Sequence, residues 1–123
     1  MKDIGLLDVL GTMYVVYESK MSTDGYMKEN GLAGYCDTIE RKIVIADTTE
    51  KDVFELESDE AKKRYRQELL RHEIIHAFLS EAGLRDSANP CETSWAKNEE
   101  MVDWFALLWP KIQSAFEAVN AVG

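Results

Sequence analysis

The sequence has few cysteines and few basic residues, and each shortage narrows what the protein can be. Its two cysteines, Cys36 and Cys91, stand far apart and outside any C-x-x-C pattern. They predict reduced thiols rather than a disulfide, which is typical of cytoplasmic proteins. Lysine and arginine number 14 against 23 acidic residues, and the formal net charge of −9 opposes binding to nucleic acid and to anionic membranes. We therefore expect a cytoplasmic protein with neither partner.

Long apolar runs are missing as well. No stretch reaches the roughly 18 consecutive apolar residues that a membrane-spanning helix needs. Acidic residues, Asp3 and Asp8, interrupt the start of the chain, so no signal peptide is predicted there. A length of 123 residues with 46% hydrophobic content predicts one domain over residues 1–123, with a modest core.

Three short segments have the β-branched and aromatic composition of strands. They are residues 12–18, 32–37 and 42–46, and the last two flank a polar connection that is typical of a hairpin. The polar residues 19–30 predict a loop with room for one helical turn. We expect an α+β fold whose small antiparallel or mixed sheet has about three strands.

The only two histidines of the chain belong to one expected helix. Its helix-forming residues begin after Ser58, a suitable N-cap, and Gly83 supplies its C-terminal end. Within it, His72-Glu73-Ile74-Ile75-His76 is an H-E-x-x-H motif. A step of four residues places both imidazoles on one helix face, about 6 Å apart along the axis. This pattern is typical of a zinc site that keeps one position for water.

Glu73 lies between the histidines and is rotated from each by roughly 100° around the helix. In a zinc site it would be the general base that takes a proton from water. The alternative is a helix whose histidines only pack, because five-residue matches also arise by chance. The histidines are in line with apolar residues, however, and buried imidazoles need partners for their ring nitrogens, which a metal supplies.

A last helix is expected over residues 95–109, capped by Thr93 or Ser94 and kinked or broken by Pro110, with a helical pattern that resumes over residues 111–119. Tryptophans recur in it at helical spacing. They predict packing in the core and not a cofactor site, since aromatic side chains dominate protein cores.

The same helix offers acids for a third metal ligand. Glu99 and Asp103 lie four apart and share a face with Val102, which we expect to point inward. A carboxylate on an inward face costs free energy unless it is paired with a cation or binds a metal. Glu99 as third zinc ligand and Asp103 as acceptor for the second nitrogen of a ligand histidine would satisfy this condition. Glu100 is the rival for the ligand position, and simple solvation is the alternative for both acids.

The motif with its downstream Asn98-Glu99-x-x-x-Asp103 resembles the gluzincin pattern of thermolysin-like zinc metallopeptidases. In its small size, its expected hairpin before the motif helix and its Pro110, the chain also resembles the ImmA/IrrE-type metallopeptidases of phages and prophages. Members of that group typically have Ala-Asn where this chain has Val102-Asp103. The resemblance implies a zincin-like α+β fold with the motif helix and the C-terminal helix holding Zn²⁺.

The resemblance also implies an activity, that of a zinc metalloendopeptidase acting on a protein or peptide substrate such as a repressor. Its ligands would be His72, His76 and Glu99, with Glu73 as base and Asp103 behind a histidine.

Thermolysin-like enzymes stabilise the oxyanion with a tyrosine and a histidine from a further domain, for which this chain has no room. Tyr35, on the expected hairpin, is our candidate for that task, whereas Tyr65 on the motif helix is expected in the core. The alternative function is that of an acidic, zinc-binding regulatory or scaffolding protein of phage type, which binds a host protein without hydrolysing it.

Overall fold

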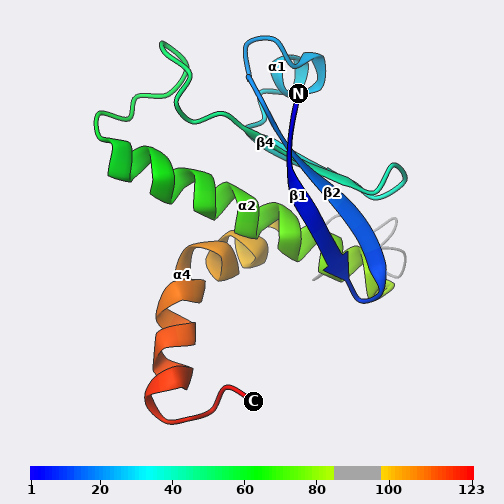
Figure 1. Ribbon diagram of the computed structural model, residues 1–123, viewed down its shortest axis with the longest axis vertical. Coiled ribbons are helices and arrows are strands. Elements are labelled where there is room, and N and C mark those ends of the chain that lie inside the picture. The colour runs from blue at the N-terminus through cyan, green and yellow to red at the C-terminus, as the bar shows by residue number, and fades with distance from the viewer. Residues whose placement is uncertain (85–97) are drawn as a thin grey trace.

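The computed structural model describes residues 1–84 and 98–123. Along the chain its elements are β1 (Lys2–Val9), β2 (Thr12–Ser19), α1 (Gly25–Asn30), β3 (Gly34–Asp37), β4 (Lys42–Ala46), α2 (Asp59–Glu81) and α4 (Glu99–Ala118). Figure 1 shows the long helix α2 lying between the sheet and α4. The α+β class is thus confirmed.

The sheet has four strands in the order β1-β2-β4-β3, where about three were predicted. The additional strand is β1, which pairs antiparallel with β2. It escaped prediction because most of its side chains are exposed, so it shows no alternation of apolar and polar residues. Strands β2 and β4 run parallel, whereas β3 and β4 form the expected antiparallel hairpin, and the sheet is therefore mixed.

The core lies between the sheet and one face of α2. Its fully buried side chains include Tyr14, Ile43 and Ile45 from the strands and Ala77 from the helix. Strand β3 is at the edge of the sheet and packs against α2. Gly34 of β3 lies next to the Glu73 side chain, so this strand borders the histidine motif.

Both predicted ends of α2 are confirmed. The Ser58 hydroxyl accepts a hydrogen bond of 3.0 Å from the Ala61 backbone N–H, as an N-cap does. At the other end, Gly83 has a φ of 81°, a left-handed conformation that glycine adopts without steric cost.

Helix α4 begins later than predicted, whereas the predicted helical structure after Pro110 is confirmed. It begins at Glu99, where the Asn98 side chain caps it by accepting from the Met101 N–H, and it continues through Pro110 to Ala118. The predicted caps Thr93 and Ser94, like Cys91, lie outside the described residues.

A side chain from α2 explains why Pro110 does not end the helix. Pro110 has no N–H, so it cannot donate to the carbonyl of Ala106, four residues earlier. The Arg71 Nε donates to that carbonyl instead, and Ala106 is fully buried. Because the acceptor is satisfied from outside, the helix can pass through the proline.

None of the helices in the described parts of the chain combines the length and the apolarity of a membrane span.

Candidate metal centre

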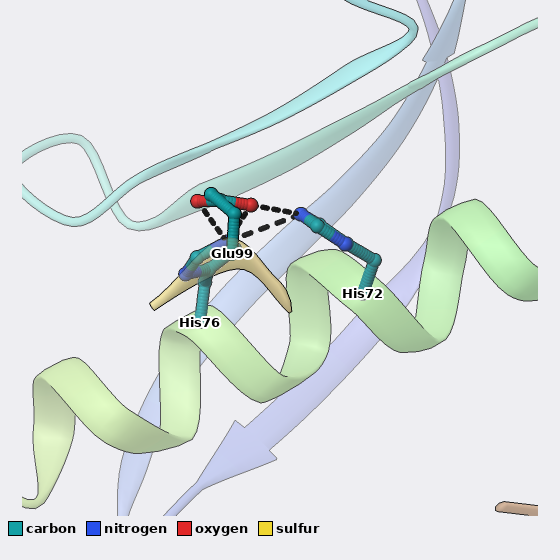
Figure 2. A group of neighbouring side chains, drawn as sticks. All are labelled: His72, His76 and Glu99. Atoms are coloured by element: carbon teal, nitrogen blue, oxygen red, sulfur yellow. Dashed lines mark hydrogen bonds and ion pairs between the residues drawn. The ribbon is translucent and has the colours of Figure 1, made fainter. Parts of the chain in front are cut away.

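The two histidines of the motif lie on successive turns of α2 with their rings side by side. The ring centroids are 4.7 Å apart, and the Nε2 atoms of His72 and His76 are separated by 3.1 Å. Figure 2 shows both imidazoles rising from the same face of the helix. The prediction that a spacing of four residues places both imidazoles on one face of the helix is therefore confirmed.

The Glu99 carboxylate completes a triangle with the histidines (Figure 2). Its Oε2 is 3.1 Å from the His72 Nε2, and its Oε1 is 3.0 Å from the His76 Nε2. One ligand atom from each of the three residues lies within 4.8 Å of the others. Ligands about 2.0–2.1 Å from a tetrahedral zinc are about 3.3 Å apart, so the spacing of these atoms fits a zinc ion.

Asp103 supports this arrangement from behind His72. Its Oδ1 lies 2.7 Å from the His72 Nδ1, at the distance of a hydrogen bond donated by the N–H of that nitrogen. The Nε2 of a neutral His72 then carries a lone pair, which points at a carboxylate oxygen of Glu99. Lone pairs that converge in this way repel one another unless a cation or a proton lies between them. The chemistry of the donor set therefore also fits a metal ion.

The two acids beside the histidines, Glu99 and Asp103, are largely exposed to solvent. Their side chains are 64% exposed for Glu99 and 65% for Asp103, whereas the neighbouring Val102 is fully buried. The two acids chosen from the sequence both lie beside the histidines, but their side chains are largely exposed and do not point into the core. Glu100 is not part of the group.

Glu73, the predicted base, is the most deeply placed acid of the site, with an exposure of 6%. Burial raises its pKa to about 8, and the nearby carboxylates of Glu99 and Asp103 add to that shift. Its Oε1 is 3.8 Å from the His72 Nε2. Strand β3 covers it closely, since a Cβ built on Gly34 would lie 3.3 Å from the same carboxylate oxygen.

No family model, curated protein or solved structure matches this chain. The likeness to gluzincins and to ImmA/IrrE-type metallopeptidases rests on the motif residues and stays a prediction.

The group of His72, His76 and Glu99, the candidate metal-binding group, adjoins a hollow of about 560 Å³ between the β3 edge, α2 and α4. Its lining includes His72, Glu73 and Glu99 together with Asp103, so two of the three predicted ligands, the base and the supporting acid face one space. The structure thereby brings together four of the predicted site residues and places His76 beside them.

The structure does not bring Tyr35 to this hollow. Its ring packs on Tyr26 of α1, with centroids 4.7 Å apart, and burial and then the carboxylate of Asp24 raise its pKa. Tyr65, which the sequence assigned to the core, lines the hollow instead. The sequence could have predicted this position, because Tyr65 precedes His72 by seven residues, or two helical turns, and so lies on the same face of the helix.

Proposed function

We propose that the protein is a zinc-dependent metalloendopeptidase that hydrolyses peptide bonds in a protein or peptide substrate. The observation that carries this proposal is the convergence of His72, His76 and Glu99 within 4.8 Å, next to a buried carboxyl group on the same hollow. Two imidazoles and one carboxylate are the ligand set of many catalytic zinc sites, which leave a coordination position open.

Each residue has a distinct task in this proposal. When bound, Zn²⁺ would polarise the substrate carbonyl and stabilise the negative charge that develops on its oxygen. Glu73 takes a proton from the attacking water as the new C–O bond forms, and it gives that proton to the nitrogen as the C–N bond breaks. Asp103 fixes the ring of His72 through the contact of 2.7 Å, which keeps the Nε2 lone pair directed at the ligand position.

The test is cleavage that depends on Glu73. The zinc-loaded protein is incubated with a mixed proteome, and new peptide termini are identified by mass spectrometry. Glu73→Gln preserves the size of the side chain but cannot accept the proton, so we expect the loss of most activity with zinc content unchanged. Glu60→Gln, in the exposed first turn of the same helix, is the matched control and should cleave as the wild type does.

Cleavage sites that persist in Glu73→Gln would contradict the proposal. Loss of zinc together with the Glu73 carboxylate would contradict its assignment as base rather than ligand. Tight zinc binding without any new termini would favour the regulatory or scaffolding alternative.

A further inference from the structure

The hollow beside the metal-binding group is strongly acidic. Five acidic side chains line it, those of Glu68, Glu73, Glu99, Glu100 and Asp103. Within the described residues no lysine or arginine lines it. The ion pairs that lysine and arginine form elsewhere in the described chain involve other acids, Asp59 and Glu18. The negative charge of this hollow is therefore not compensated by the described part of the protein.

A divalent cation would neutralise only part of that charge. Glu99 and Asp103 engage the histidines, and their two charges would balance the two positive charges of a zinc ion. Glu68, on α2, and Glu100, on α4, face the same hollow and lie outside the metal-binding group. Two charges thus remain, one on the α2 wall and one on the α4 wall, available to a ligand.

A side chain that is itself almost wholly buried also points to a ligand in this hollow. The Glu73 side chain lines the hollow although it is only 8% exposed, and its closest polar contact in the described chain is the one of 3.8 Å with His72. No hydrogen bond to it is formed by the residues that the structure describes. The oxygens of this carboxyl group are not sealed in the interior but open to the hollow, so they must take their donors from whatever occupies it.

Apolar side chains share the hollow with these acids. Trp104 and Leu107 of α4 are 52% and 58% exposed, and Leu32, before β3, is 38% exposed. All three line the hollow. Exposed aromatic and aliphatic surface next to carboxylates suits a side chain with an apolar stem and a cationic head, since a cation is also attracted to the face of an indole ring.

We propose that this hollow is a specificity site for lysine or arginine, which it would bind close to the peptide bond to be cut. The stem of the basic side chain would pack on Trp104 and Leu107, and its head would lie between the walls that carry Glu68 and Glu100. This inference rests on the proposed peptidase function, because it assigns the substrate class of that same site.

The test uses two fluorescent peptides that differ in one residue, arginine or citrulline. Citrulline has nearly the shape of arginine but no charge, so the pair isolates the cationic head. Binding is measured by fluorescence anisotropy on the zinc-loaded Glu73→Gln variant, and cleavage is measured on the wild type. We expect the arginine peptide to be preferred about tenfold in both, from two partly screened charge pairs and a cation–π contact, and the preference should fall as salt is raised.

Substitutions of Glu68 and Glu100 test whether these two acids cause the preference for arginine. With Glu68→Gln and Glu100→Gln combined, the preference for arginine should fall to about two-fold or less, whereas Glu60→Gln should retain it. Both acids are at least partly exposed, so their amides should not disturb folding, which a thermal melt verifies. Equal binding of the two peptides, or a preference that survives the double substitution, overturns the specificity site.

The two proposals fail in different ways. If both peptides are cut at equal rates, the peptidase function stands and the specificity site is wrong. If neither peptide is cut, the binding measurements alone decide on the specificity site: a charge-dependent preference supports it as a binding site, and equal affinities overturn it.

Discussion

At the scale of single residues, the register of α4 decides which acid would hold a metal ion. The Glu99 carboxylate is 3.1 Å and 3.0 Å from the two histidine nitrogens, whereas Glu100 is turned about 100° around the helix and lies outside the group. We expect Glu99→Ala to abolish tight zinc binding and Glu100→Ala to leave the affinity nearly unchanged. Asp103→Asn should weaken zinc binding by about 10- to 100-fold, because it acts through the orientation of His72.

Competition with a zinc-binding dye ranks these three variants directly. If Glu100→Ala proved the most damaging, the register of the helix described above would be wrong by one residue.

A second residue-scale prediction concerns Glu81, at the end of α2. Tyr14 and Thr12 of β2 donate hydrogen bonds of 2.7 Å and 2.9 Å to its carboxylate, and these bonds lower its pKa. A lowered pKa means that the folded state favours the charged form. Glu81 therefore adds stability above its unfolded pKa of about 4.3, and this contribution is lost as the pH falls through the folded value.

We expect Glu81→Gln to be less stable than the wild type at pH 7, with the difference shrinking below about pH 4. Urea unfolding of the metal-free protein at both pH values measures it, and Glu60→Gln is the exposed control. A stability difference that is the same at both pH values would show that the charge of Glu81 is not involved.

The spacing of residues within one helix was enough to predict much of the candidate site. Helical geometry is local, so the four-residue steps from His72 to His76 and from Glu99 to Asp103 fix the shared faces without knowledge of the rest of the chain. The burial of Glu73 under Gly34 could not be read in this way, because it depends on a strand about forty residues earlier in the chain.

At the scale of elements, the bond between Arg71 and the Ala106 carbonyl joins α2 to α4 at the point where Pro110 leaves that carbonyl without its own helical donor. The sequence held a signal for this bond, since any proline inside a helix frees the carbonyl four residues earlier. What it could not show is which side chain supplies the donor.

A double-mutant cycle tests this pairing. Arg71→Met keeps an apolar stem but removes the donor, and we expect a loss of about 1–3 kcal/mol because a buried carbonyl is left unsatisfied. In a Pro110→Ala background the alanine N–H can serve the carbonyl, so Arg71→Met should cost clearly less. Urea unfolding of the four metal-free proteins gives the coupling energy. Strictly additive losses would mean that Arg71 does not compensate for the proline.

Prediction of the sheet was limited by its non-local pairing. The β3–β4 hairpin was predicted from its short polar connection, which brings neighbouring strands together. The parallel pairing of β2 with β4 joins Val15 to Lys42 across an intervening helix and strand, and no local pattern specifies it. The pairing of an exposed strand such as β1 is also weakly encoded, because neither of its faces is consistently apolar.

At the scale of the whole molecule, metal binding would join two parts of the structure. His72 and His76 belong to α2, which packs against the sheet, whereas Glu99 belongs to α4, which lies on the other side of α2 in Figure 1. An ion shared between them would add to the free energy that holds α4 in place. It would do less for the strands, which have their own hydrogen bonds and core.

Removal of the metal should therefore lower the melting temperature and loosen α4 most. A ligand at 100 times its Kd stabilises the native state by about 2.7 kcal/mol, which corresponds to roughly 10 °C for a domain of this size. Hydrogen exchange should accelerate in α4 after chelation and change little in β2 and β4. His72→Ala, which lacks a ligand, should melt at the same temperature with and without chelator. An unchanged melt of wild-type protein that elemental analysis shows to have lost its zinc would break the link between the metal and the packing of α4 on α2.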